Sequence, residues 1–286
     1  MFVIVGVVVV IGSVFGGFLA EGGNFEVLIQ PFELLIIAGA AAGAFLISNP
    51  KHVIAKVAGA IGHLLKGSKY GKDSYLDLLG LLYQIFKIAK SKGMLSLEQH
   101  VENPSESSLF NAFPKFGADH AAVTFLCDYL RLLTLGTDNA HEIEGLMDEE
   151  IETHHAEHAQ IAGALQTMAD GMPALGIVAA VLGVINTMGA INQPPAILGH
   201  LIGAALVGTF LGVLLSYGFV GPIGNGLKAI YDAELKYFQC IKAGLLAHMQ
   251  GYAPAISVEF ARKALLSNVR PTFYEVEEAN AALPPA

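Results

Sequence analysis

Charge is missing from long stretches of this sequence. Between Gly171 and Leu227, 57 consecutive residues contain no Asp, Glu, Lys or Arg, and residues 1–50 contain no Lys or Arg. Charged residues make up only 14% of the chain, against about 25% in an average soluble domain. Hydrophobic residues make up 53%, and the mean hydropathy is +0.54. These gaps exclude an ordinary soluble protein and predict a chain that is partly embedded in a membrane.

Cysteine, basic charge and the usual catalytic motifs are also scarce. The two cysteines, Cys127 and Cys240, are far apart and neither lies in a CxxC motif, which indicates a reducing compartment without disulfides. The net charge of −9 argues against nucleic-acid binding. The glycine-rich segment 221–226 lacks the lysine of a phosphate-binding loop, and no nucleophile elbow is present. We therefore expect neither an enzyme acting on a soluble substrate nor a bound cofactor.

Four apolar segments suit a bilayer, whose hydrocarbon core of roughly 30 Å takes about 20 helical residues to cross. They are expected to span the membrane at residues 2–20, 33–49, 172–191 and 197–220, although the second is rather short. The sequence Asn192-Gln193-Pro194-Pro195 predicts a turn between the last two spans. The predicted organisation is a transmembrane hairpin at 1–50, a polar block at 51–170, a second hairpin at 171–220 and a polar tail at 221–286.

The distribution of lysine and arginine predicts the orientation of these spans. Basic residues follow spans two and four, whereas the two short loops at 21–30 and 192–195 contain none. Since short cytoplasmic loops carry the Lys/Arg excess, both termini and the polar block are expected on the cytoplasmic side of the membrane. The first apolar segment lacks a basic leader, so we expect it to be retained as a span and not cleaved as a signal.

The polar block has the pattern of a helical domain. Residues 75–90 carry apolar side chains at helical spacing, and residues 111–135 are similar. Residues 139–168 predict a long charged helix that runs directly into span three. No strand-like alternation bounded by turns occurs, so the sequence predicts an all-α membrane protein.

A histidine-rich stretch near the end of the block is a candidate metal site. The segment from His141 to Gly145 begins like a zinc-protease motif, but Gly145 replaces the second histidine. His154 and His158 are four residues apart on the predicted helix and so could share a metal ion. A solvated helix face just inside the membrane is the simpler interpretation, and we expect no metal.

The last two spans contain polar side chains but no carboxylate. A membrane Ser or Thr commonly bonds to the backbone of its own helix, which is the simplest role for these residues. Proteins that conduct ions usually keep an ionisable group inside the membrane, and here we find none beyond His200 and Tyr217. Either the chain conducts nothing, or a second polypeptide supplies the charged group. The other hydroxyl-bearing residues are Thr187, Thr209 and Ser216.

Two prolines mark the cytoplasmic ends of these spans. Pro173 is expected in the first turn of span three, where its missing N–H costs little. Pro222 follows span four and is expected to open the polar tail. The two prolines either simply mark the ends of the spans or form a hinge between the membrane and cytoplasmic parts, and the sequence fits both interpretations.

Several long segments resemble one known family. They are PALGIVAAVLGVINTMGA at 173–190, LGHLIGAALVGTFLGVLLSYGFVGP at 198–222, and GMLSLE at 93–98 followed by ENP at 102–104. Together with the four spans and the large cytoplasmic middle, they resemble the MotA stator subunits of the bacterial flagellar motor, within the MotA/TolQ/ExbB proton-channel family. The resemblance covers nearly the whole chain. An energiser of outer-membrane processes of the ExbB/TolQ type and a non-conducting membrane scaffold are the alternatives.

The resemblance implies partners that the chain itself does not contain. It implies a homopentameric ring around two copies of MotB, a single-span subunit that carries a conducting Asp and a periplasmic peptidoglycan-binding domain. Such a partner would account for the missing carboxylate. Proton flow would then turn the ring against the switch protein of the rotor C-ring, which drives flagellar rotation in motility and chemotaxis.

The resemblance also implies roles for residues in the spans. Pro173 and Pro222 match the prolines that couple proton flow to movement, and Thr209 matches the threonine facing the conducting Asp. Ala180 stands where sodium-driven relatives carry a second Thr, which implies protons as the coupling ion. The expected proton pathway also includes Thr187 and Tyr217.

Three residues of the polar block are the implied contacts with the rotor. Glu98 matches the acidic torque residue of the cytoplasmic loop. Lys90 stands where the family usually has Arg, so the charge is kept but the planar, bidentate guanidinium is lost. Lys92 is close enough in sequence to share that role.

Overall fold

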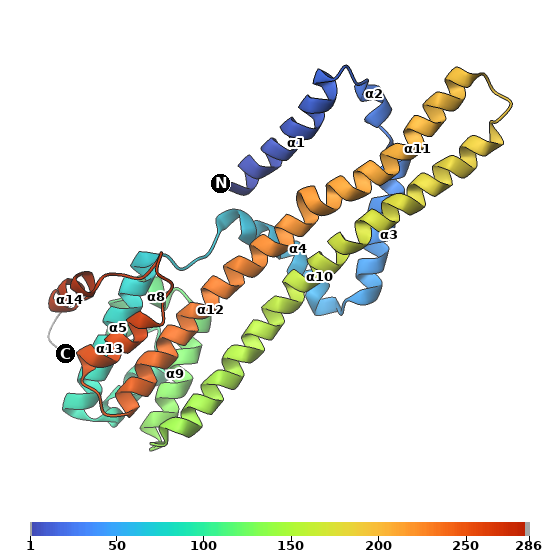
Figure 1. Cartoon of the computed structure of the whole chain (residues 1–286). Coiled ribbons are helices and arrows are strands. Elements are labelled where there is room, and N and C mark those ends of the chain that lie inside the picture. The colour runs from blue at the N-terminus through green and yellow to red at the C-terminus, as the bar shows by residue number, and fades with distance from the viewer. Residues whose placement is uncertain (1, 284–286) are drawn as a thin grey trace. The chain divides into compact units, whose positions relative to one another are not determined.

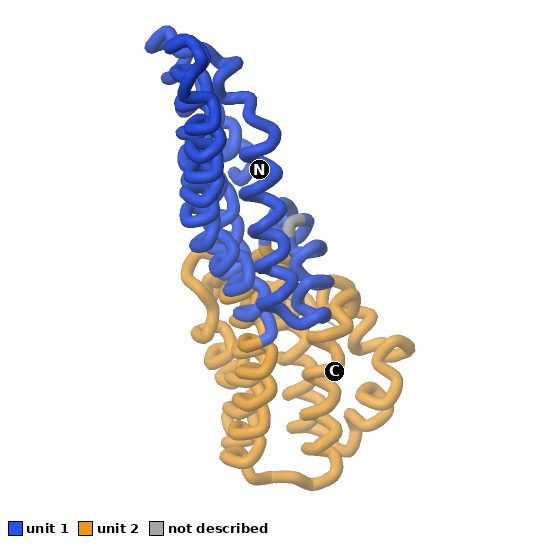
Figure 2. The backbone as a smooth tube through the Cα atoms, turned by 90° about the vertical axis from the view of Figure 1, so that its right-hand side faces the viewer, with its two compact units in different colours: residues 1–67, 157–230 blue, residues 68–156, 231–286 orange. Residues whose placement is uncertain are grey.

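The computed structural model describes residues 2–283, which form α-helices and shorter helical turns throughout and contain no strand (Figure 1). The chain divides into two compact units (Figure 2). Unit 1 comprises residues 1–67 and 157–230, and unit 2 comprises residues 68–156 and 231–286. This division follows packing, whereas the four boundaries expected from hydropathy concern the membrane and remain predictions.

Four helical segments are long and apolar enough to cross a membrane, as the sequence predicts. The first is α1 (Phe2–Ala20), and the second joins α2 (Phe25–Leu28) to α3 (Pro31–Ser48). The third lies within α10 (Ala140–Gly189). The fourth lies within the run Pro195–Met249, which consists of α11 (Pro195–Leu215), the π-helical turn η2 (Ser216–Val220) and α12 (Gly221–Met249).

Within unit 1, glycines allow α10 and α11 to approach backbone to backbone. A Cβ atom placed on Gly212 would lie 2.8 Å from the Cα of Gly176, and one placed on Gly183 would lie 2.7 Å from the Cβ of Ala205. Small residues at such contacts are what lets membrane helices associate closely. We call these two segments the α10–α11 pair. Helix α3 and the short α2 pack against its α11 side.

Other small-residue motifs have no such partner within the chain. Gly12 and Gly16 of α1, and Gly39 and Gly43 of α3, have nothing within 4 Å of a Cβ atom placed on them. No residue of α1 is buried in the part of the chain that the structure describes. Both glycine pairs have the GxxxG spacing that suits close packing of membrane helices. This spacing alone therefore does not distinguish contacts made inside this chain from surfaces left open.

Unit 2 is built around α5 (Lys72–Lys92), which contributes ten buried residues to its core. This helix confirms the prediction for residues 75–90. It packs directly against α13 (Pro254–Lys263) and α14 (Phe273–Ala281), and α9 (His120–Thr134) contributes to the same core. The short elements of unit 2 are η1 (Met94–Leu97), α6 (Glu98–Glu102), α7 (Ser108–Asn111) and α8 (Pro114–Gly117), and α4 (Lys51–Lys66) belongs to unit 1.

The prediction of one helix over residues 111–135 is wrong in its first third. Two short turns, α7 and α8, precede α9, which begins only at His120. Phe113 precedes a proline and therefore leaves the helical region, with φ −124° and ψ 74°. The side chain of Asp119 then accepts a hydrogen bond from the N–H of Ala122 and caps the new helix.

The prediction for the end of the polar block is confirmed, because α10 runs without a break from Ala140 to Gly189. The same continuity corrects the position of Pro173, which lies well inside α10 and not in a first turn. The helix begins far outside the apolar segment, at a start where the side chain of Asn139 accepts a hydrogen bond from the N–H of His141. The residue at which the sequence becomes apolar is therefore not the residue at which the helix begins.

Pro222 does not end a helix either. The α-helical ladder changes to a π turn at Ser216, and the N–H of Gly221 donates to the carbonyl of Ser216, five residues back. A proline cannot donate the next backbone hydrogen bond, and a local π turn is one of the devices that let a helix continue past such a defect. Helix α12 then runs on to Met249.

Candidate functional site

The predicted residues of α10 lie on one stripe of that helix. Pro173, Ala180 and Thr187 are spaced by seven residues, which is close to two helical turns. On the facing helix, Gly208 adjoins Thr209, and a Cβ atom placed on Gly208 would lie 3.0 Å from the backbone N of Ala180. The structure therefore brings Ala180 and the Thr209 segment to the same level of the α10–α11 pair.

The two threonines differ in how their hydroxyls are used. The Thr187 hydroxyl donates to the carbonyl of Gly183 at 2.8 Å, and this side chain is buried. Thr187 thus has the backbone-bonded role that is simplest for a membrane threonine. Thr209 is half-buried, and its hydroxyl forms no hydrogen bond within residues 2–283. Its hydroxyl remains available to a group from outside the chain.

The irregularities caused by the two prolines lie beside each other in unit 1. Pro173 lacks the N–H that would bond to the carbonyl of Ala169, four residues earlier in α10. The Cβ of Ala169 lies 3.8 Å from the position of a Cβ on Gly221, the residue before Pro222. The Ser216 hydroxyl at the start of the π turn is buried and has no partner among the described residues. Both helices therefore have a weakened backbone ladder at the same level.

Tyr217 is not brought into this arrangement. Its side chain is 68% exposed on the surface of unit 1, although it belongs to the π turn. Any part that Tyr217 takes in proton movement would need a neighbouring chain against this surface.

A carboxylate from outside spans three and four lies against the α10–α11 pair. Glu33 belongs to the first turn of α3. Its Oε1 is 3.3 Å from the position of a Cβ on Gly183, and its Oε2 is 2.9 Å from that of a Cβ on Gly208. Spans three and four contain no carboxylate of their own, as the sequence shows, but the fold brings one from the start of span two against them. The only sequence signal was an acidic residue at the very start of a short apolar span.

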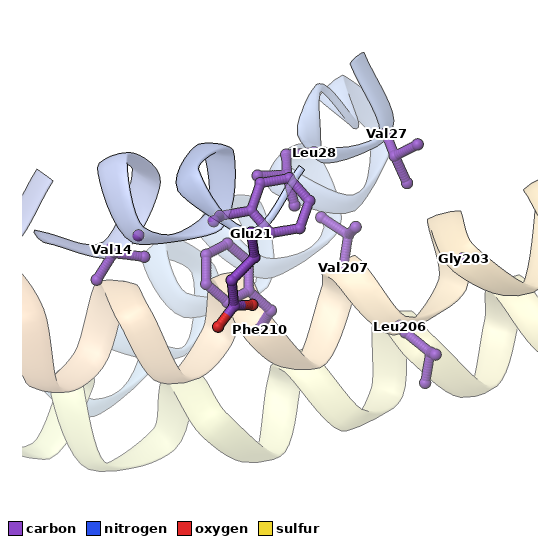
Figure 3. A pocket seen from close by; sticks show the side chains of 10 residues that line it. Val14, Glu21, Val27, Leu28, Gly203, Leu206, Val207 and Phe210 are labelled. Atoms are coloured by element: carbon purple, nitrogen blue, oxygen red, sulfur yellow. The ribbon is translucent and has the colours of Figure 1, made fainter. Parts of the chain in front are cut away.

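A separate cavity lies between α1, α2 and α11, with a volume of about 480 Å³. Figure 3 shows the Glu21 carboxylate among apolar side chains that include Val207 and Phe210. None of the predicted pathway residues lines this cavity. The candidate site is therefore the α10–α11 pair, and the cavity is not part of it.

The three predicted rotor-contacting residues lie close together along the chain in unit 2. Lys90 and Lys92 occupy the last turn of α5, and Glu98 begins α6 after the short η1 turn. Gly93, with φ +85°, ends α5 in a conformation that favours glycine and turns the chain toward Glu98. All three charged side chains are exposed, and none forms an ion pair within the described residues. They are available to an external partner.

Two residues of the histidine-rich stretch, His154 and His155, pack against α12 within unit 2. The His154 ring stacks on Phe238 with centroids 5.5 Å apart, and Nδ1 of His155 lies 3.8 Å from a carboxylate oxygen of Asp232. Over residues 2–283, no three His, Cys, Asp or Glu side chains gather as a metal site would require. The geometry thus gives His154 and His155 packing and surface-pairing roles.

A half-buried acidic residue supports the fold of unit 2 at the start of α9. Asp119 accepts a hydrogen bond from the Tyr70 hydroxyl and pairs with Nζ of Lys69 at 2.9 Å. Burial by itself would raise the pKa of Asp119, but the hydrogen bonds from Tyr70 and Lys69 outweigh it and hold this pKa below its usual value. Asp119 is therefore ionised at neutral pH and joins residues 69–70 to the first turn of α9.

Comparison with known proteins shows which proteins this chain is similar to. Residues 4–93 match the family model described as Motility protein A N-terminal, and residues 118–240 match that of the MotA/TolQ/ExbB proton channel family. The chain is 48% identical to Motility protein A of Escherichia coli K12 over 97% of this chain and 94% of that one.

Two solved structures share the fold. The first, described as the structure of C. jejuni MotAB, is 22% identical with a TM-score of 0.78, covering 94% of this chain and 98% of that chain. The second is the flagellar MotAB stator complex from Bacillus subtilis, at 25% identity and a TM-score of 0.71, covering 96% and 98%. The all-helical arrangement of the present chain is thus one already seen in a stator complex.

Proposed function

This chain belongs to the Motility protein A branch of the MotA/TolQ/ExbB proton channel family, and we propose that it works as a proton-conducting stator subunit of the flagellar motor. The similarity to Motility protein A over nearly the whole chain carries this proposal. It favours the motor subunit over an ExbB/TolQ-like energiser, and a mere scaffold would not need the unbonded Thr209 hydroxyl.

The conducting site is completed by a partner chain. Helices α10 and α11 place Ala180 and Thr209 at one level, and their apolar segments contribute no carboxylate of their own. The solved relatives are complexes named MotAB, which supports a MotB-like partner here. In this proposal a homopentameric ring surrounds two partner helices, each partner supplies an Asp opposite Thr209, and its outer domain binds peptidoglycan.

The coupling ion is the proton. A sodium ion must exchange its water for several oxygen ligands, as other hard cations do. Ala180 offers no oxygen at the level of Thr209, which supplies one hydroxyl per chain. A carboxylate opposite Thr209 takes up and releases a proton without such a cage of ligands. Thr187 supports α10 from its backbone-bonded position, and Tyr217 meets a neighbouring chain on the surface of the ring.

Proton binding is converted to movement at the two prolines. The missing backbone hydrogen bond at Pro173 and the π turn before Pro222 make the two helices easiest to bend at one level. Changes in bending there would shift the helices that continue into unit 2. In the proposed orientation, with both termini cytoplasmic in the inner membrane, Lys90, Lys92 and Glu98 then push on the switch protein of the rotor C-ring.

Reconstitution tests the function directly. Liposomes that contain this chain alone are expected to hold a proton gradient, whereas liposomes that contain it with the MotB-like partner are expected to conduct protons. In cells, swimming should persist when potassium replaces sodium and should stop with a protonophore. Substantial proton leakage without the partner would contradict the shared site. Sodium-dependent speed at fixed membrane potential would overturn the proton assignment alone.

A further inference from the structure

Glu33 occupies a gap that only glycine leaves open. Its two carboxylate oxygens lie 3.3 Å and 2.9 Å from where Cβ atoms on Gly183 and Gly208 would stand. Any larger residue at Gly208 would meet the carboxylate and the backbone of Ala180 together. The first turn of α3 therefore inserts an acidic group directly against both helices of the α10–α11 pair.

The Glu33 side chain is half-buried, and one of its carboxylate oxygens lacks the partner that an ionised group needs. Its Oε2 is inaccessible to solvent and has no hydrogen-bond partner among the described residues. The chain has no Lys or Arg in residues 1–50 or 171–227, which form most of its surroundings in unit 1. Holding an unpaired charge in such a place is strongly unfavourable, whereas a neutral acid is tolerated. Glu33 thus has a physical reason to hold a proton.

The level of Glu33 along the helices matters for conduction. Gly208 precedes Thr209, and Gly183 is one turn from Ala180 along α10. The acid thus lies at the level of Ala180 and the Thr209 segment, which are the residues proposed to face the partner's carboxylate.

We propose that Glu33 is a second proton-exchanging carboxylate of the channel, supplied by this chain and additional to that of the partner. This inference rests on the proposed function. The neutral acid releases its proton to water near Thr209 and becomes a carboxylate, and it is restored when it takes a proton from water on the opposite, non-cytoplasmic side. No bond other than the O–H bond changes, and each cycle moves one proton inward.

Proton flux with conservative variants tests the inference. The full chain is reconstituted with its partner, and proton uptake is compared for the parent, Glu33→Gln and Glu26→Gln. The amide introduced by Glu33→Gln would keep the shape of the neutral acid but cannot exchange a proton, while Glu26 is an exposed residue of α2 and serves as the matched control. We expect flux to fall at least about ten-fold in Glu33→Gln, since a positioned proton-transfer group contributes about 10²–10⁴-fold. Glu26→Gln should match the parent.

The result that overturns the inference is equally specific. If Glu33→Gln assembles with the partner and conducts like the parent, Glu33 is a packing residue. If the parent complex itself conducts nothing, the proposed function fails instead, so the two failures are distinct. Should Glu33→Gln not assemble, Glu33→Asp keeps the acid but withdraws it by one methylene. An assembled Glu33→Asp complex is expected to conduct less than the parent, and unchanged flux would count against proton exchange.

A spectroscopic measurement gives a readout independent of transport. Infrared spectra of the chain in lipid should contain the carbonyl band of a protonated carboxylic acid at neutral pH. This band should be lost in Glu33→Gln and kept in Glu26→Gln. Its presence in Glu33→Gln, or its absence from the parent, would show that Glu33 does not hold the proton.

Discussion

Gly212→Ala places one methyl group into the tightest backbone-to-backbone contact of the α10–α11 pair. The new Cβ would lie 2.7 Å from the carbonyl oxygen of Met172 and 2.8 Å from the Cα of Gly176. Ordinary contact begins at 3.4 Å, so the backbones must separate by about 0.7 Å along that line (3.4 − 2.7 Å). Both atoms belong to backbone, and no side chain can rotate away to relieve the overlap.

The magnitude follows from two opposing effects. Alanine is favoured over glycine in a helix by about 1 kcal/mol. Inserting a methyl group into a well-packed contact costs about 1–3 kcal/mol. Gly199 of the same helix has nothing within 4 Å of its Cβ position, so Gly199→Ala carries the propensity gain alone. Gly212→Ala should therefore be about 1–3 kcal/mol less stable than Gly199→Ala, which is roughly 5- to 150-fold in the folding equilibrium.

The assay compares the two alanine variants under identical conditions. Unfolding in mixed micelles with rising SDS, followed by helical circular dichroism, reports the difference in stability. Swimming speed reports the consequence for the motor, because the displaced backbone adjoins Pro173. We expect Gly199→Ala to swim like the parent and Gly212→Ala to lose most of its speed. Equal stability of the two variants would refute the close backbone approach on which the site depends.

The remaining predictions concern three other positions. Thr209→Val should lower swimming speed while membrane assembly persists, because it removes the one unbonded hydroxyl at that level; unchanged speed would make Thr209 a packing residue. Glu98→Lys should reduce torque but not proton flux, since its exposed charge steers contacts, and a reversed charge on the rotor should restore rotation; failure of every reversal would point to a folding role. Asp119→Ala should cost about 1–2 kcal/mol at pH 7 in a denaturant titration, through the lost α9 cap and the Lys69 pair. The pKa of Asp119 is lowered in the folded chain, so this difference in stability should shrink as the pH falls below about 4, the ordinary pKa of Asp. A difference that does not change with pH would contradict the contribution of the ionised carboxylate.

Hydropathy and periodicity were sufficient to predict most of the helices. The charge-free run 171–227 locates the α10–α11 pair, and the spacing of apolar residues predicts α5. Both signals average over many residues, so single exceptions do not hide them. Local chemistry decided the part of 111–135 that was wrong, where the constraint on Phe113 before a proline and the cap at Asp119 outweighed the apolar pattern.

Helix ends were harder to predict than helix interiors. Pro173 and Pro222 both coincide with a change in hydropathy, and both lie in helical runs that continue on either side. A proline weakens a helix but does not end it when the flanking turns are held by packing. Such packing is a property of distant residues, here the facing glycines of the α10–α11 pair. The sequence near each proline therefore does not distinguish a simple helix end from a hinge.

Glu33 shows why considering the polar residues of each span separately misses part of a membrane site. Spans three and four contain no carboxylate, and a second chain is one solution to that lack. The fold adds another, because α3 packs on α11 so that its first turn faces Gly183 and Gly208. The two glycines are unremarkable in a chain with 32 of them, and only their pairing with an acid across the helices gives them a chemical role. A single residue at the start of one span can thus alter the electrostatics of two others, because in hydrocarbon even one unpaired carboxylate must either be paired or hold a proton.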